Sequence, residues 1–324
     1  MYFESVRTSK GQDAVSSFLW DSAGSCRWAQ DVMQVNPIIL RQRYTVQQAI
    51  EHFILQSLDT LLVVQEAELS RCMKLAGRVC IKDILRLILP SLLRKDMTGF
   101  HDVLAAPVND LVIAHPKTVT PWTAMVDVIT AMQADYTQVI GIEQDGKLAG
   151  QATSDTIVKL LASIVSDAPE MPGVQAHGVW RICVHDLMAG YVICLEPGDD
   201  IARAICLFLA TAARYIPVLD KQARLVGIIS QQDILNYVAS LMDPVSLSVF
   251  ENKDHILDRP VCSLFTQESQ TISNKAALPN AVQLLACYSS GCLAVTDSQN
   301  KFCGILGYSE LFNWIVRHPH ILSA

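Results

Sequence analysis

Ser230 and Asp233 stand three residues apart, where an apolar run at 225–229 passes into a helix-like run. A carboxylate offers two acceptor oxygens and can receive hydrogen bonds from two neighbouring hydroxyl groups. The serine hydroxyl and the unpaired N–H groups of a helix start suit an oxyanion or a sugar oxygen. The same spacing is also that of a capping box, in which the two side chains only close the helix end. The pair therefore predicts either a ligand-binding helix start or a plain cap.

Arg214 is the nearby candidate cation, three residues before Pro217. A guanidinium group suits phosphate because it can donate two parallel hydrogen bonds. The alternative interpretation is a solvated arginine at a helix end, where the helix dipole favours a positive charge.

The elements that must position these residues follow from the hydrophobic pattern around them. The pattern predicts a strand at 192–195, an amphipathic helix at 201–213, strands at 216–219 and 225–229, and a helix that begins at Ser230. The expected order is strand, helix, strand, strand, helix.

This unit occurs four times. Its first landmark recurs at intervals of 79, 76 and 77 residues, as Asp31-Val32-Met33, Asp110-Leu111-Val112, Asp186-Leu187-Met188 and Ser263-Leu264-Phe265. A glycine follows each landmark after 40 to 46 residues, as Gly77, Gly150, Gly227 and Gly304. Two landmarks in register make chance similarity improbable.

The repeats organise the whole chain into an α/β protein. We expect an extension at 1–27 and repeats at 28–89, 104–165, 180–242 and 259–317. A linker with Pro and Gly at 167–173 separates the second and third repeats, which suggests two pseudo-symmetric pairs, first with second and third with fourth.

The third repeat resembles the cystathionine-β-synthase (CBS) domain family. The residues that carry the resemblance are Val184-His185-Asp186-Leu187-Met188, Tyr215-Ile216-Pro217-Val218-Leu219-Asp220 and Gly227-Ile228-Ile229-Ser230-Gln231-Gln232-Asp233-Ile234-Leu235. The first repeat is a good match, and the second and fourth are degenerate. The resemblance implies paired repeats that pack sheet against sheet as a Bateman module, with clefts for adenosyl ligands. Four copies in one chain are similar in layout to the gamma subunit of AMP-activated protein kinase.

The resemblance also implies roles for particular residues. Asp233 would accept hydrogen bonds from both ribose hydroxyls, Ser230 would assist, and Arg214, near Pro217, would face the phosphate. Adenine would lie against Tyr191, Val192 and Ile193. The alternative for Val192 and Ile193 is ordinary strand core.

The other repeats depart from this pattern. The first keeps the acid as Asp83 but has Cys80 in place of the hydroxyl, so Asp83 and Ile38 mark a second candidate site. The second has Thr156 where the acid belongs, and the fourth has Glu310 and no hydroxyl. We expect one strong site in the third repeat and altered or empty sites in the second and fourth.

Composition limits the classes of partner. Hydrophobic residues make up 51% and charged residues 18%, and the net charge is −7, which favours packed cores and disfavours nucleic acid as a partner. The longest apolar stretches fall short of the ~20 residues of a membrane span. The chain starts without a secretory signal pattern, so a cytoplasmic location is expected. The ten cysteines are scattered, which favours reduced thiols over a metal site.

No catalytic motif for phosphate loops, dinucleotides, zinc proteases or serine hydrolases occurs, so we expect neither an enzyme nor a resident cofactor. The leading hypothesis is a regulatory sensor that binds AMP, ADP or ATP and signals to a protein partner, such as a kinase, a transporter or another effector. A homodimer is compatible with this hypothesis. The first rival is a ligand-free scaffold for protein–protein interaction, and the second is a cryptic enzyme acting on nucleotides.

Overall fold

A computed structural model describes residues 28–65, 73–167, 182–242, 256–265, 269–288 and 291–317. The extension at 1–27 and the linker residues 168–173 lie outside the described residues. Among the helices in the described ranges, none has the length and apolarity that a bilayer crossing requires.

The first two repeats share one order of elements. The first contains β1 (Ile39–Arg41), α2 (Val46–Gln56), β2 (Thr60–Val64), β3 (Leu75–Cys80) and α3 (Ile81–Leu93). The second contains β5 (Thr118–Val119), α5 (Met125–Ala134), β6 (Val139–Gln144), β7 (Lys147–Thr153) and α6 (Ser154–Asp167). The helix α4 (Met97–Ala105) connects them. In each repeat the first strand is parallel to the second, which forms an antiparallel hairpin with the third.

The second pair follows the same plan. The third repeat contains α8 (Ile201–Ala210), β8 (Tyr215–Leu219), β9 (Leu225–Ser230) and α9 (Gln231–Ser240). The fourth contains β10 (Thr271–Ser273), α11 (Leu278–Tyr288), β11 (Cys292–Thr296), β12 (Phe302–Gly307) and α12 (Tyr308–Arg317). The predicted α/β fold of four repeats is therefore confirmed, although the third repeat lacks the first strand.

Two details of the third repeat differ from the expectation. The strand at 192–195 is reduced to one parallel bridge between Leu195 and Val218. To extend this parallel pairing toward residue 193, the N–H of residue 217 would have to donate to the Ile193 carbonyl, and Pro217 has no N–H. The helix α8 ends at Ala210 rather than 213, because the backbone turns extended at Thr211, with φ −125° and ψ 171°. The Thr211 N–H and hydroxyl both donate to the Leu207 carbonyl, the hydroxyl at 2.8 Å.

The two landmarks of the repeats meet in space, but across repeats. The first landmark of the second repeat begins in η2 (Val108–Leu111) and ends at Val112, directly before β4 (Ile113–Ala114), and β4 pairs with β3 of the first repeat. A Cβ built on Gly77 would lie 2.3 Å from a Val112 methyl group and 2.4 Å from the Ile113 carbonyl oxygen. Gly150, Gly227 and Gly304 meet Met33, Phe265 and Ala189 in the same way. Each landmark glycine therefore admits the starting segment of the other repeat in its pair.

Within a pair the repeats contact through their sheets. Leu62 and Val64 of β2 join Val139 and Leu148 of the second repeat in one apolar cluster. In the second pair Ala189 bridges Ile305 of β12. The pairing of first with second and third with fourth therefore rests on sheet contacts and exchanged segments.

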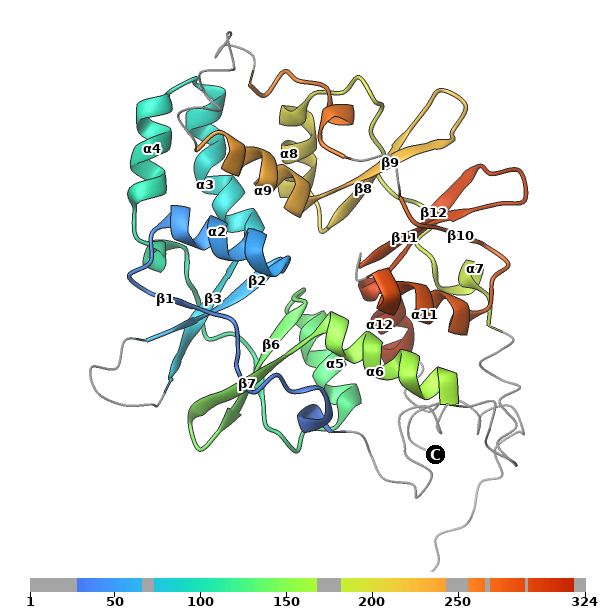
Figure 1. The fold of residues 1–324 in the computed structure, drawn as a ribbon, viewed down its shortest axis with the longest axis horizontal. Helices are drawn as coiled ribbons and strands as arrows, with labels where there is room; N and C mark the ends of the chain where they lie inside the picture. The colour runs from blue at the N-terminus through green and yellow to red at the C-terminus, as the bar shows by residue number, and fades with distance from the viewer. Residues whose placement is uncertain are drawn as a thin grey trace, which may run out of the picture.

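Between the pairs the contacts are helical. One core cluster combines α2 and α3 of the first repeat with α8 and α9 of the third, and includes the fully buried Phe53, Ile84, Phe208 and Ile234. The other combines α5 and α6 of the second repeat with α11 and α12 of the fourth. The four repeats thus surround a common centre, in the order first, third, fourth, second (Figure 1).

Candidate functional site

The Ser230–Asp233 pair joins the end of β9 to the start of α9. Asp233 Oδ2 accepts hydrogen bonds from the Ser230 N–H and hydroxyl, both at 2.7 Å, and the Asp233 N–H donates to Ser230 Oγ at 3.1 Å. The capping box is therefore formed. Burial raises the pKa of the Asp233 carboxyl, and the two Ser230 hydrogen bonds oppose that rise. Within the described residues Oδ1 has no hydrogen-bond partner, so one oxygen of the carboxylate can still accept from a ligand.

The corresponding side chain closes the helix start in the other repeats too. The N–H groups of Cys80, Thr153 and Gly307 donate to Asp83, Thr156 and Glu310 at 3.1, 3.0 and 2.9 Å. Capping is thus common to all four repeats, including the second, which has Thr156 in place of the acid. What distinguishes the third repeat is a hydroxyl and a short acid together.

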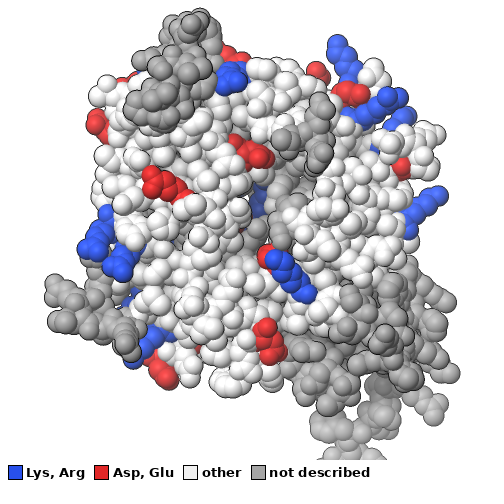
Figure 2. Space-filling view, in the orientation of Figure 1, with Lys and Arg blue, Asp and Glu red and all other residues white. Residues whose placement is uncertain are grey.

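Ser230, Asp233 and Arg214 line one cavity of about 360 Å³, named here the Asp233 cavity. Its other walls include Asp59 of the first repeat, Gln138 of the second, and Gln270 before β10. The volume lies within the range of small-molecule sites. On the face shown in Figure 2, basic atoms are visible inside the hollow between the four repeats.

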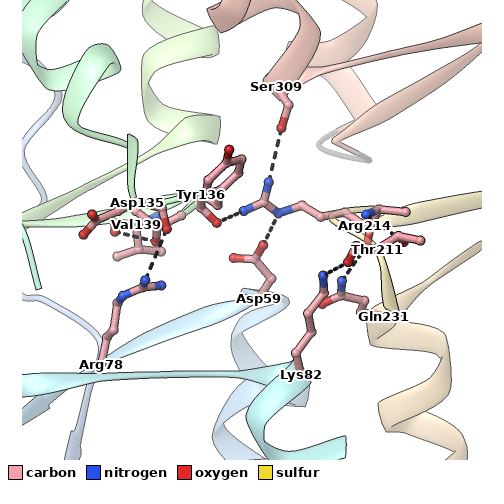
Figure 3. A network of polar contacts seen from close by, with 12 residues as sticks. Asp59, Arg78, Lys82, Asp135, Tyr136, Val139, Thr211, Arg214, Gln231 and Ser309 are labelled. Carbon is pink, nitrogen blue, oxygen red and sulfur yellow. Dashed lines mark hydrogen bonds and ion pairs between the residues drawn. The ribbon is translucent and has the colours of Figure 1, made fainter. Parts of the chain in front are cut away.

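Arg214 contacts all three other repeats (Figure 3). Its Nε donates to Asp59 Oδ2 at 2.5 Å, Nη2 to the Tyr136 carbonyl at 2.5 Å, and Nη1 to Ser309 Oγ at 3.2 Å. The Arg214 and Asp59 side chains are only 17% and 16% exposed. Burial acts to lower the pKa of Arg214, but the Asp59 carboxylate outweighs it and raises that pKa. The interpretation as a solvated helix-end arginine is therefore wrong.

The residues expected against the base lie elsewhere. Tyr191, Val192 and Ile193 line a second cavity of about 520 Å³, the Tyr191 cavity, together with Glu310 of the fourth repeat. The exchange of starting segments explains this, because the segment after Asp186 serves the helix start of the fourth repeat. Pro217 is buried in β8 and lines neither cavity. The structure thus separates Ser230 and Asp233 from the other four residues, whereas Arg214 lines the Asp233 cavity and the Tyr191 cavity alike.

The second candidate site is not assembled as a pair. Asp83 caps α3 and forms an ion pair with Arg86 at 3.3 Å. The Ile38 N–H donates to Gln151 Oε1 at 3.1 Å, in β7 of the second repeat. Neither residue lines the Asp233 cavity or the Tyr191 cavity.

A third cavity, of about 410 Å³, holds residues that the sequence interpretation missed. The Lys82 cavity is lined by four basic side chains, Arg78, Lys82, Arg86 and Arg214, and by two acidic ones, Asp59 and Asp135. The available signal was the basic spacing at 78, 82 and 86 around the helix start of the first repeat.

The groups around this cavity are strongly perturbed. Lys82 Nζ donates to the Thr211 carbonyl at 2.5 Å. Burial lowers the pKa of Lys82, and the nearby charge of Arg214 lowers it further. Burial, reinforced by Asp83, raises the pKa of the Cys80 thiol to about 12. The lowered pKa of Lys82 thus reflects burial beside a second positive charge, whereas the raised pKa of Cys80 reflects burial beside a carboxylate.

Known proteins fit this fold. Residues 184–240 match the family model described as "CBS domain". Protein MJ1225 of Methanocaldococcus jannaschii is 21% identical over 210 residues, covering 65% of this chain and 69% of that protein. Its crystal structure, described as that of a candidate archaeal homologue of gamma-AMPK, matches with a TM-score of 0.73 at 16% identity, over 89% of this chain and all of that one.

Two further proteins are similar. An uncharacterised conserved protein of Pyrococcus horikoshii matches with a TM-score of 0.57 at 16% identity, covering 90% of this chain and 100% of that chain. A CBS domain-containing protein of Dictyostelium discoideum is 24% identical over 107 residues, covering 32% of this chain and 70% of that protein. Residues 184–240 thus match the CBS domain family, and the chain as a whole, with its four repeats of one plan, has a fold similar to that of protein MJ1225.

Proposed function

We propose that this chain is a non-catalytic regulatory sensor that binds an adenine nucleotide in the Asp233 cavity and signals to a protein partner. The observation that carries the proposal is the lining of that cavity, which combines a hydroxyl, a carboxylate and a guanidinium group. Asp233 would accept from ribose hydroxyls, and Arg214 would bind the first phosphate. The fold likeness to a candidate archaeal homologue of gamma-AMPK supports the proposal by analogy.

The position of Arg214 supplies the means of signalling. Its guanidinium group donates to the first, second and fourth repeats at once. A phosphate that takes up part of this group competes with Asp59 and changes how the repeats are held. A ligand shifts a protein between two arrangements only through a difference in affinity for them, and this competition provides one.

The test is calorimetric titration of the wild-type protein and the Asp233→Asn variant with AMP, ADP and ATP. Asparagine keeps an acceptor for the Ser230 N–H but loses the charge and one acceptor oxygen, so binding is expected to weaken at least about tenfold. Thr45→Ala is the matched control, because Thr45 caps α2 in the same core but lines none of the three cavities.

Unchanged nucleotide affinity in Asp233→Asn contradicts the site. Absence of binding by any adenosyl compound in the wild-type protein, with no shift of its melting temperature, favours the rival function of a ligand-free scaffold.

A further inference from the structure

The Asp233 cavity and the Lys82 cavity adjoin. Asp59, Arg214 and Gln231 line both of them. Asp59 and Arg214 form the ion pair described above, and the Gln231 amide donates to the Ala213 carbonyl at 2.8 Å. The boundary between the cavities is therefore made of side chains rather than of a continuous backbone wall.

The two cavities differ in charge. The charged side chains of the Asp233 cavity are Arg214, Asp59 and Asp233, so acids outnumber bases. The Lys82 cavity has twice as many bases as acids. In a partly buried site such a difference acts over several ångströms, because little water is present to screen it. A ligand that lies across the boundary thus meets a carboxylate at one end and excess positive charge at the other.

The bases of the Lys82 cavity are incompletely neutralised. Lys82 Nζ has three donors, and the contact within the described residues is the Thr211 carbonyl, which is uncharged. Arg78 donates through Nη2 to the Asp135 carbonyl at 3.2 Å, whereas its buried Nε has no partner within the described residues. Figure 3 shows Arg78 and Lys82 on either side of Asp59, both extending toward the side on which Arg214 lies. Buried donors without acceptors are costly, and phosphate oxygens would satisfy them.

We infer that the Lys82 cavity holds the outer phosphates of the ligand and makes this chain selective for nucleoside di- and triphosphates over the monophosphate. The inference rests on the proposed function, because it takes the ribose to lie at Asp233. With the first phosphate at Arg214, a monophosphate ends at the boundary between the cavities. A second and a third phosphate continue past the Asp59–Arg214 pair to Lys82 and Arg78. Lys82, from the first repeat, is then a specificity-determining residue for a ligand held by the third.

The experiment compares AMP with ATP by calorimetry, in the presence of EDTA, for the wild-type protein and Lys82→Met. Methionine keeps the length and apolar body of the lysine side chain and removes its charge. We expect wild-type protein to bind ATP about tenfold or more tightly than AMP, as one or two charge-assisted contacts imply. Lys82→Met should reduce that ratio about tenfold, with AMP affinity changed less than about twofold.

Two variants complete the design. Lys221→Met removes the same charge from the exposed β8–β9 turn, outside all three cavities, and should leave the ratio unchanged. Arg86→Gln serves if Lys82→Met does not fold, since Arg86 lines the same cavity and its side chain is 63% exposed. It should also lower the ratio.

The outcomes separate the two proposals. Equal affinities of AMP and ATP for the wild-type protein, both weakened in Asp233→Asn, overturn the phosphate selectivity and support the nucleotide site. An ATP preference that is unchanged in both Lys82→Met and Arg86→Gln also overturns the role of the Lys82 cavity and leaves the nucleotide site supported. No Asp233-dependent binding of either nucleotide overturns both proposals.

Discussion

Arg214 links the third repeat to the other three repeats at the centre of the molecule. Three of its nitrogen atoms donate to three different repeats, and its charge is matched by Asp59 at 2.5 Å. Taking both ions out of water is unfavourable, and their attraction offsets that loss only while both are present. The pair therefore sets the relative position of the first and third repeats more than it adds net stability.

Removal of one partner should therefore be costly. Arg214→Met leaves Asp59 buried and charged, and we expect a loss of about 3–5 kcal/mol in the free energy of unfolding, measured in urea. The double variant Asp59→Asn/Arg214→Met should lose clearly less than the sum of the single variants. Arg203→Met is the control, because Arg203 pairs with Asp199 at 3.5 Å with 62% of its side chain exposed, and should lose less than about 1 kcal/mol. Additive losses would contradict the coupling.

At the scale of elements, the close crossing at the landmark glycines holds each pair together. The strand β3 accepts the segment 112–114 of the second repeat at a distance that only a missing side chain permits. Each landmark glycine touches the starting segment of its partner repeat and not that of its own.

Gly77→Ala tests this crossing. The added methyl group would meet the Ile113 carbonyl oxygen at 2.4 Å, which requires a backbone shift. We expect a loss of about 1–3 kcal/mol in the free energy of unfolding, as for other overpacked sites. Gly198→Ala is the matched control, because nothing lies within 4 Å of its added methyl group. Equal effects of the two substitutions would show that the crossing is looser than the geometry indicates.

For the whole molecule, sheet contacts and helix contacts hold different parts of the chain together. Sheets and exchanged segments join the repeats of a pair, whereas the two large apolar cores each combine one repeat from each pair. Neither pair therefore buries its own helical faces. A signal that moves one pair against the other must pass through these cores or through the charged centre.

The halves of the chain should consequently depend on each other. Fragments 1–167 and 168–324, produced separately, are expected to bind an apolar dye such as anilinonaphthalene sulfonate, because each exposes two helical faces. When mixed, they should form a 1:1 complex in size-exclusion chromatography and lose the dye signal. Two monomeric fragments with cooperative melting and no dye binding would contradict shared cores.

The local sequence pattern determined the repeat, the order of its elements and the caps, because hydrophobic period and helix-start chemistry act over a few residues. It also found Ser230, Asp233 and Arg214, which lie within one repeat and share a cavity. Only the tertiary structure decided which repeat each starting segment completes. It separated Tyr191, Val192 and Ile193 from Asp233. It also placed Lys82 of the first repeat and Arg214 of the third in the lining of one cavity. The reason is that these neighbours are set by packing between repeats far apart in the chain, which leaves no periodic trace in the sequence.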